Sequence, residues 1–482
     1  MSWKETVEPV FQALPSVEGP DGHVSLRKKL TWTLGILVLY FFLTNVGIFG
    51  LSEGGADAFG QFRGILAGEH GSVLQLGIGP IVFGSIALQL IVGAGIFNID
   101  RQDPRDQAIY QGLQKVFVFG IVLIQAFPLI FVFDFLPADP ILGQQLGLSP
   151  TALGVLMYLQ IVIGGILIFY MDAVVSKWGI GSGVGLFIVA GVSQRLIGGL
   201  IGIPGYLGSQ WGVIPSWVAI ITGRFQITWD LQSFLFGQAQ LLAVLTTVLI
   251  LGIVVYAELV KVEIPVKRKG TTVSGTYPIK LIYASVIPII IIRAIQANFQ
   301  ILGRGLDRAL GESMPAWLGQ YANGQPTGGF FYFVTPIQSP EQWMWWTGTA
   351  TGEAWQILLR VGVDMTITIV GAALLSVFWV QTTDMGADSV ASKISRGDLE
   401  IPGFRDHPSI IEKRVEKYIP QVTILGGALV GFLAVLANLL GTIGGVTGVG
   451  LLLTVSITYK LYEQLAKEGM KEMHPMARQL FD

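Results

Sequence analysis

Long apolar runs that are almost free of charge recur along the whole chain, and they decide its fold class. A helix of about 20 such residues is long enough to cross the hydrocarbon core of a bilayer. Only 13% of the residues are charged, against roughly 25% in an ordinary soluble domain. We predict ten membrane-spanning helices, at residues 30–50, 73–97, 112–134, 150–171, 180–203, 238–260, 278–299, 356–381, 421–441 and 446–466. The sequence therefore predicts an all-α, multi-pass membrane protein.

The distribution of Lys and Arg over the connecting segments predicts the orientation. Cytoplasmic loops of membrane proteins are enriched in Lys and Arg. With the N-terminus inside, all but seven of the 30 Lys and Arg fall on the inner side, the exceptions being Arg63, Arg195, Arg224, Arg293, Arg304, Arg308 and Arg360. Both termini are therefore predicted to be cytoplasmic.

Ten spans divide into two sets of five, and an odd number per half is what two pseudo-symmetric inverted halves require. The predicted divisions are an N-terminal segment 1–29, a first half 30–203, an outer segment 204–237, a second half 238–466 with basic inner loops 261–280 and 382–420, and a tail 467–482. Apolar residues at helical spacing in 2–14 fit an amphipathic helix on the membrane surface. A disordered tail interrupted by Pro9 fits the same residues.

Motifs for catalysis and for cofactor or metal binding are missing from the sequence. There is no cysteine, all four histidines lie outside the predicted spans, and neither a zinc-protease motif nor a phosphate-binding glycine loop occurs. Arg293, Arg360 and Asp364 are placed near the outer ends of their spans, which leaves the predicted interior with little charge. We therefore predict no enzyme and no cofactor. Both a conduit and a carrier of a small neutral solute remain open.

Several strings of the sequence resemble the SecY family in its archaeal and eukaryotic branch. They are LGIGPIV at 76–82, QLIVG at 89–93, YQGLQK at 110–115, VSKWGIGSG at 175–183, AGVSQ at 190–194, VEIPV at 262–266, YPIK at 277–280, YIP at 418–420 and TVSI at 454–457. They follow the family's order from the first spans to the C-terminus. The outer segments 203–237 and 300–355 resemble the family least.

This resemblance implies a ten-helix clamshell that passes unfolded polypeptides across the membrane and releases hydrophobic segments sideways into lipid. It also implies several partners: a small single-span SecE/gamma-type subunit, a small beta-type subunit, the ribosome, and nascent signal sequences. The expected location is the plasma membrane of an archaeon.

The family's pore ring is matched by six aliphatic positions. They are Ile78, Val82, Ile180, Val184, Ile290 and Leu453, with Leu452 as the alternative in the last span. An aliphatic ring dewets, so it blocks ions and still deforms around a passing chain. Ile78 with Val82, and Ile180 with Val184, are spaced to share one helical face. Lipid-facing or packing roles also suit such residues.

The family's plug, a short helix that closes the outer funnel, is matched by residues 53–68. That segment is too short to span, and an ordinary outer loop is the alternative. The plug residues singled out are Phe59, Phe62, Arg63, Ile65 and Leu66.

The family's lateral gate is matched by four residues, Phe83, Gln89, Gln125 and Asn298. Buried Gln and Asn can also serve as simple interhelical hydrogen-bonding groups. Phe83 stands where relatives often carry a hydroxyl, which predicts a gate biased toward the closed state or toward needing more hydrophobic signals.

The family's ribosome-docking loops are matched by Lys267, Arg268, Lys269 and Arg405. Clustered Lys and Arg suit the phosphates of ribosomal RNA. Ordinary positive-inside charge and contact with anionic lipid are the alternatives.

Overall fold

The computed structural model divides the chain into two compact units, Met1–Val192 with Ile457–Asp482 (unit 1) and Ser193–Ser456 (unit 2). The residues that the structure describes are 4, 8–9, 11, 14–52, 66–93, 95–97, 99, 103–133, 135–204, 211–224, 235, 239–268, 274–282, 287–322, 325–347, 350, 352–383, 385–396, 399–400 and 408–473. The unit boundaries fall inside two helices, α8 (Gly183–Ile201) and α18 (Gly448–Met473).

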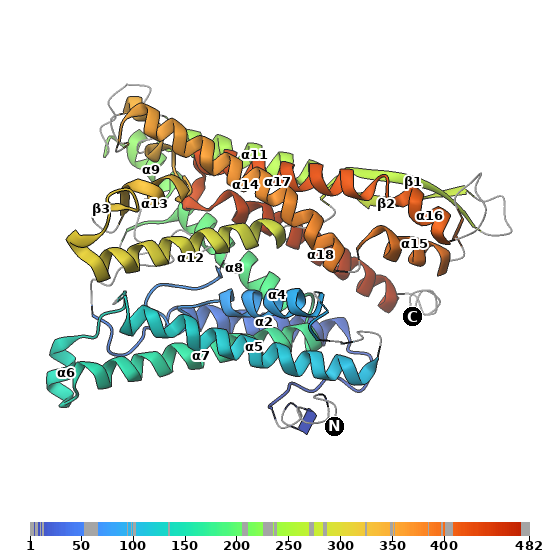
Figure 1. Cartoon of the computed structure of the whole chain (residues 1–482), viewed down its shortest axis with the longest axis horizontal. Helices are drawn as coiled ribbons and strands as arrows, with labels where there is room; N and C mark the ends of the chain where they lie inside the picture. The colour runs from blue at the N-terminus through green and yellow to red at the C-terminus, as the bar shows by residue number, and fades with distance from the viewer. Residues whose placement is uncertain are drawn as a thin grey trace. The chain divides into compact units, whose positions relative to one another are not determined.

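Unit 1 is helical (Figure 1). Besides its parts of α8 and α18, it contains α2 (Leu26–Thr44), α4 (Gly79–Gly93), α5 (Pro104–Phe131), α6 (Pro140–Leu146) and α7 (Pro150–Trp178). The starts of α5 and α7 are encoded locally, because Asp103 and Ser149 cap the first turns with their side chains and each is followed by proline. Small residues let the helices approach closely: a Cβ on Gly84 of α4 would lie 2.8 Å from Val118 of α5.

Unit 2 combines long helices with short elements at both of their ends (Figure 1). Its long helices are α11 (Leu241–Leu259), α12 (Ile287–Leu310), α14 (Ala354–Thr382) and α17 (Ile419–Leu440). Glycines of α17 pack against α14, since a Cβ on Gly431 would lie 2.9 Å from the Thr368 carbonyl oxygen. The shorter elements are α9 (Val213–Ile221), β1 (Lys261–Arg268), β2 (Ser274–Lys280), η1 (Gly311–Ser313), β3 (Gln320–Ala322), β4 (Gln325–Gly328), α13 (Gly329–Val334), η2 (Pro340–Gln342), η3 (Trp345–Thr347), α15 (Ala387–Arg396), β5 (Leu399–Glu400), α16 (Pro408–Val415) and η4 (Ile443–Gly445).

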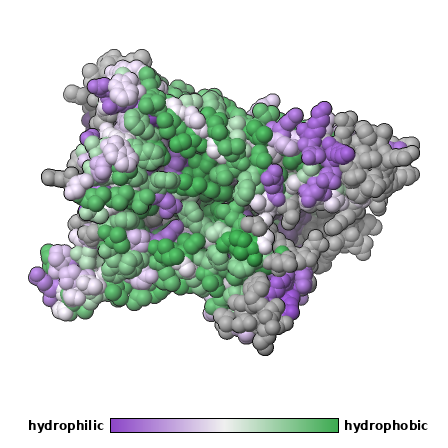
Figure 2. Space-filling view, viewed as in Figure 1, coloured by the Kyte–Doolittle hydropathy of each residue, from purple (hydrophilic) through white to green (hydrophobic). Residues whose placement is uncertain are grey.

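Each of the ten predicted spans overlaps a helix in the described part of the chain. Within that part, six helices are long and apolar enough to cross a membrane: Arg105–Phe131, Pro150–Trp178, Gly183–Ile201, Leu241–Leu259, Ala354–Thr382 and Ile419–Leu440. Figure 2 shows hydrophobic residues over the flanks of the helices, with hydrophilic residues gathered toward their ends. Such flanks suit contact with lipid.

Two predicted spans begin well before their helices do. The second helix begins at Gly79 rather than at residue 73, because the chain before it turns and Gly77 adopts a positive φ of 54°. The seventh helix begins at Ile287 and continues to Leu310, whereas the prediction ran from 278 to 299. Residues 278–280 belong to β2, so the apolar run that looked like a helix start is part of a strand.

The basic loop 261–280 is a β-hairpin, which the prediction of an all-helical chain did not include. β1 pairs with β2 in an antiparallel register, and β5 joins the other edge of β1. Ile264 and Val266 point into a core with Ile279, Ile394 and Ile411. The alternation of apolar and polar residues in VEIPV has the period of a strand, so the sequence did contain the signal.

The described residues of the N-terminal segment contact unit 1. Phe11 is buried against Leu88, Ile109 and Leu113, and its ring lies over Gly112 of α5. Nearby, Lys4 forms an ion pair with Asp106 at 2.7 Å. These contacts favour a docked amphipathic segment over a disordered tail, with Phe11 covering protein rather than lipid.

Candidate functional site

Ile78 and Val82 lie where the backbone that follows the expected plug meets the start of α4. The Ile78 amide donates to the Leu66 carbonyl oxygen at 2.7 Å, and the Tyr40 hydroxyl donates to the Ala67 carbonyl oxygen at 2.9 Å. Ile78 is 1% exposed and Val82 is half-buried. The Val82 amide donates to the Ile78 carbonyl oxygen at 3.1 Å, which is a helical turn, so these two residues share one face as predicted.

Ile180 and Val184 do not share a helical face, so the interpretation of their spacing is wrong. Ile180 lies in a bend before α8, and the next residue, Gly181, has a φ of 77°. The Ile180 amide donates to the Thr33 hydroxyl at 3.0 Å. The Val184 amide donates to an Asp172 carboxylate oxygen at 2.8 Å, so Asp172 of α7 satisfies the first turn of α8. Sequence reasoning missed this capping role of Asp172.

The remaining ring positions lie in unit 2. Ile290 is half-buried in α12, whereas Leu452 and Leu453 of α18 are both buried. Burial therefore does not choose between Leu452 and Leu453. Because the six ring positions come from both units, their convergence on one axis stays a prediction.

Most of the expected plug lies outside the described residues, including Phe59, Phe62, Arg63 and Ile65. Leu66 is described and is half-buried. Its side chain packs over Gly79, where an added Cβ would lie 3.4 Å from Leu66 Cδ2 and 3.9 Å from Gln125 Oε1. The end of the expected plug is therefore close to one of the predicted gate residues.

The predicted gate residues of unit 1 lie on two helices in contact. Phe83 and Gln89 belong to α4 and Gln125 belongs to α5, and all three are half-buried. The side-chain oxygen of Gln89 is buried and has no hydrogen-bond partner among the described residues. In unit 2, Asn298 of α12 is exposed, and its amide group donates to the Ala294 carbonyl oxygen of the same helix at 2.8 Å.

A polar contact between α4 and α5 was missed by sequence reasoning. The Gln114 side-chain amide donates to the Ser85 hydroxyl at 2.8 Å, two residues beyond Phe83. The signal was available, because both are polar residues inside or beside apolar runs, where polar side chains usually find a partner on another helix.

The predicted docking residues Lys267 and Arg268 lie at the end of β1. Both pair with β5, in the register Lys267 with Glu400 and Arg268 with Leu399. The sheet therefore joins the two basic loops that the sequence places on one side of the membrane. Lys269 and Arg405 lie outside the described residues.

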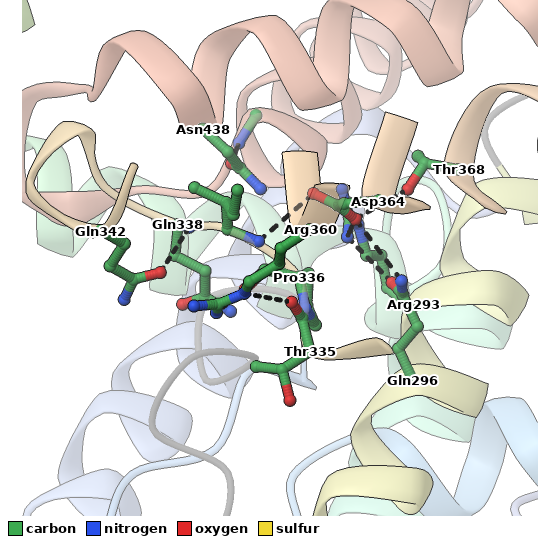
Figure 3. A network of polar contacts seen from close by, with 12 residues as sticks. Arg293, Gln296, Thr335, Pro336, Gln338, Gln342, Arg360, Asp364, Thr368 and Asn438 are labelled. Atoms are coloured by element: carbon green, nitrogen blue, oxygen red, sulfur yellow. Dashed lines mark hydrogen bonds and ion pairs between the residues drawn. The ribbon is translucent and has the colours of Figure 1, made fainter. Parts of the chain in front are cut away.

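A buried polar network joins α12, α14 and the segment after α13 (Figure 3). Arg293 and Asp364 form an ion pair at 3.2 Å, and their side chains are 3% and 1% exposed. Asp364 also accepts from Gln296, Thr368 and the Ile337 amide. The predicted span 278–299 placed Arg293 near its end, whereas Arg293 lies close to the start of α12. Arg293 lies in the second turn of α12, and Asp364 lies three turns into α14.

Arg360 belongs to the same network and links α14 to the segment after α13. Its guanidinium donates to the Thr335 carbonyl oxygen at 3.0 Å and lies 4.8 Å from the centre of the Tyr332 ring. In this network the described charges bind protein groups of unit 2, which is the arrangement of a structural element.

Comparisons with known proteins cover nearly the whole chain. A family model for SecY matches residues 72–462, and a model for the plug domain of Sec61p matches residues 38–71. The protein translocase subunit SecY of Haloarcula marismortui is 55% identical over 100% of both chains. That of Haloferax volcanii is also 55% identical, over 100% of this chain and 99% of the relative.

Solved structures give the same result for the fold. A structure described as that of a protein conducting channel has a TM-score of 0.77 at 33% identity, covering 97% of this chain and 98% of the other. Sec61 in the canine ribosome-channel complex from the endoplasmic reticulum has a TM-score of 0.74 at 32% identity, with the same coverage. With family matches over both the channel and the plug region, this chain belongs to the SecY family.

Proposed function

We propose that this chain is the central, pore-forming subunit of a Sec protein translocase. It passes unfolded polypeptides across the membrane and releases hydrophobic segments laterally into lipid. The observation that carries the proposal is the full-length match to translocase subunits, together with the match to the plug domain. The relatives named above are translocase subunits and channels, which favours a channel over a carrier of a small neutral solute.

The physical basis of the proposed channel is hydrophobicity rather than a binding pocket. Aliphatic side chains such as Ile78 and Val82 repel water, so a narrow ring of them stops ions without binding a substrate. Lateral release follows from partitioning: each central Leu or Ile contributes roughly 0.3–0.6 kcal/mol toward lipid, against about 3 kcal/mol for each charge.

A photocrosslinking experiment tests the proposed channel directly. A photoreactive residue placed at Val82 is expected to capture a nascent chain stalled during translocation into membrane vesicles. The same residue at Val38, which is 61% exposed on α2, serves as the matched control and is expected to capture lipid instead. Absence of nascent-chain capture at Val82, with normal targeting, would contradict the proposal.

Val82→Asn is expected to increase the ion conductance of the idle channel severalfold, because an amide in the proposed ring retains water where a valine excludes it. Planar-bilayer recording of the reconstituted channel is the measurement. Val38→Asn is the matched control and should leave the conductance at the level of the unmodified protein. Equal conductance of both variants would remove Val82 from the ring.

Phe83→Thr is expected to lower the hydrophobicity that a signal sequence needs in order to open the gate. The hydroxyl would restore a weakly polar contact between helices where Phe83 now adds apolar packing. A translocation assay with signals of graded leucine content measures this threshold. Phe127→Thr, at a residue 51% exposed on α5, is the control. An unchanged threshold for Phe83→Thr would refute the proposed bias toward the closed gate.

We also propose that the sheet joining the two basic loops docks the ribosome. Its support is the pairing of Lys267 and Arg268 with β5, and the relative whose structure is a ribosome–channel complex. Lys267→Ala is expected to weaken binding and to reduce the slope of log affinity against log salt by about 1, since one phosphate contact is lost. Arg224→Ala, at an exposed residue on the predicted outer side, should leave the slope unchanged.

The proposed assembly includes a SecE/gamma-type subunit and a beta-type subunit, carried over from the family. The proposed location is an archaeal plasma membrane with both termini in the cytoplasm, supported by the loop charges and by the archaeal relatives. Cysteine accessibility at positions such as 471 and 224 distinguishes this orientation from its inverse.

A further inference from the structure

A pocket lies at the end of unit 2 that carries the three-stranded sheet. Its volume is about 290 Å³, and it is walled by the end of α14, the start of α15, one face of α16 and the start of α17. Val380 and Ile419 give it an apolar wall, and both belong to the core beneath the sheet. Ligand pockets for drug-sized molecules occupy about 300–1,000 Å³, so this pocket suits one small molecule or one long side chain.

The charged residues that line this pocket in the described part of the chain are all acidic. They are Asp388 from α15, Glu412 from α16 and Glu416 from the turn that follows α16, and none of the described lining residues is basic. Glu412 and Glu416 are one helical turn apart, and the Glu416 amide donates to the Glu412 carbonyl oxygen at 2.7 Å. Their side chains therefore project from one face. Three carboxylates repel phosphates, nucleic acids and anionic lipid, so the charge of the pocket selects a cation.

A buried hydroxyl in the pocket wall lacks a partner. Thr423 of α17 lines the pocket and is 1% exposed, and its Oγ1 makes no hydrogen bond with any of the described residues. A threonine inside a helix usually satisfies its hydroxyl on the carbonyl oxygen four residues earlier. Thr366 does so in α14, on Gly362. The Thr423 hydroxyl is thus a polar group left available for something inside the pocket.

We propose that this pocket binds a protonated amine or guanidinium carried on a short apolar stem. The carboxylates of Asp388, Glu412 and Glu416 neutralise the cation. Its alkyl chain lies along Val380 and Ile419, and the Thr423 hydroxyl accepts a hydrogen bond from one N–H. The chemistry is shared by two sources, a free alkylamine and the Lys or Arg side chain of a partner protein. The site shares no residue with the proposed ring and gate, and it does not depend on the proposed translocation activity.

Binding of hexylammonium to the purified full-length chain in lipid nanodiscs tests the proposal. Isothermal titration is expected to show saturable binding that weakens with salt, whereas 1-hexanol, with the same stem and no charge, should bind at least about tenfold more weakly. The Glu412→Gln and Glu416→Gln double variant should lose about tenfold in affinity for hexylammonium. Glu263→Gln, an exposed carboxylate of the same unit in β1, is the matched control and should leave binding unchanged.

Thr423→Val tests the hydroxyl separately, because valine has nearly the same shape and fills the same space. The variant should keep its thermal unfolding temperature and lose hexylammonium affinity severalfold. If the affinity stays unchanged, the hydroxyl does not contact the cation. The proposal is overturned if hexanol or hexanoate binds as tightly as hexylammonium, or if the double variant binds like the unmodified chain.

Competition distinguishes the two sources. The peptide acetyl-Leu-Lys-Leu-amide presents the same ammonium on a protein-like backbone. If the peptide displaces hexylammonium at a lower concentration than butylammonium does, the natural ligand is the side chain of a partner protein. The reverse order indicates a free amine, and failure of both to displace hexylammonium contradicts a shared site.

Discussion

Asp364→Ala is expected to destabilise the protein by about 3–5 kcal/mol, because it leaves the Arg293 guanidinium buried and without its counter-charge. The Asp364 carboxylate accepts from Arg293 Nη1 at 3.2 Å and from the Ile337 amide at 3.2 Å. Removing it therefore leaves a cation and a backbone donor unsatisfied at once. Thermal unfolding in detergent, followed by tryptophan fluorescence, measures the loss.

The matched control for this prediction is the double replacement Arg293→Leu with Asp364→Leu. Removing both charges takes away the desolvation penalty together with the attraction, so the double variant should recover most of the stability. Thr366→Val, on an exposed part of the same helix, should change stability little. If Asp364→Ala unfolds at the temperature of the unmodified protein, the ion pair is not a structural element of unit 2.

The position of Arg293 in α12 could not be predicted from hydropathy. Arg293 looked like an outer residue because the apolar run at 278–299 was taken as one helix. In the structure the first residues of that run belong to β2, and α12 is Ile287–Leu310. This helix includes Arg304 and Arg308, which hydropathy alone would assign to a loop. Arg293 is buried with Asp364 as its partner, whereas Arg304 is half-buried and Arg308 is exposed. Hydropathy could not show that Arg293 is buried in an ion pair, because it scores each residue without regard to the residue that it contacts.

The fold itself was largely predictable, because crossing a membrane imposes a helix wherever some 20 apolar residues follow one another. The boundaries of α7 and α14 agree with the sequence at their starts, where Ser149 and Glu353 provide caps. The β-hairpin was not predicted, because its signal is only five alternating residues, and the basic loop that contains them was interpreted only by its positive charge.

For the candidate site, the sequence could propose residues but not their geometry. Ile78 and Val82 share a face because helical spacing continues from one to the other, whereas Ile180 and Val184 do not, because Gly181 breaks the spacing. The Asp172 contact with Val184 depends on two helices meeting and leaves no mark in either local sequence. Spacing arguments therefore hold only where no glycine with a positive φ intervenes.

Gly77→Ala is expected to separate the end of the proposed plug from the start of α4. Gly77 has a φ of 54°, which costs a residue with a Cβ about 1–2 kcal/mol. The new Cβ would also lie 2.1 Å from the Leu66 carbonyl oxygen and 2.7 Å from the Gly68 amide nitrogen. Because these are backbone atoms, the segment 66–68 must move, and the hydrogen bond from the Ile78 amide to Leu66 must lengthen or break. A sustained ion leak through the idle channel, measured in planar bilayers, is the expected result.

Gly95→Ala is the control that separates the clash of a new Cβ with Leu66 from the cost of a positive φ. Gly95 has a φ of 72°, similar to that of Gly77, but an added Cβ would meet nothing within 4 Å. It should therefore show the conformational cost alone, without a leak. If both alanine variants conduct alike, the contact between Gly77 and Leu66 does not hold the seal. If only Gly77→Ala leaks, the seal depends on a backbone crossing that tolerates no side chain, and glycine at position 77 is a requirement of the closed state rather than of helix packing.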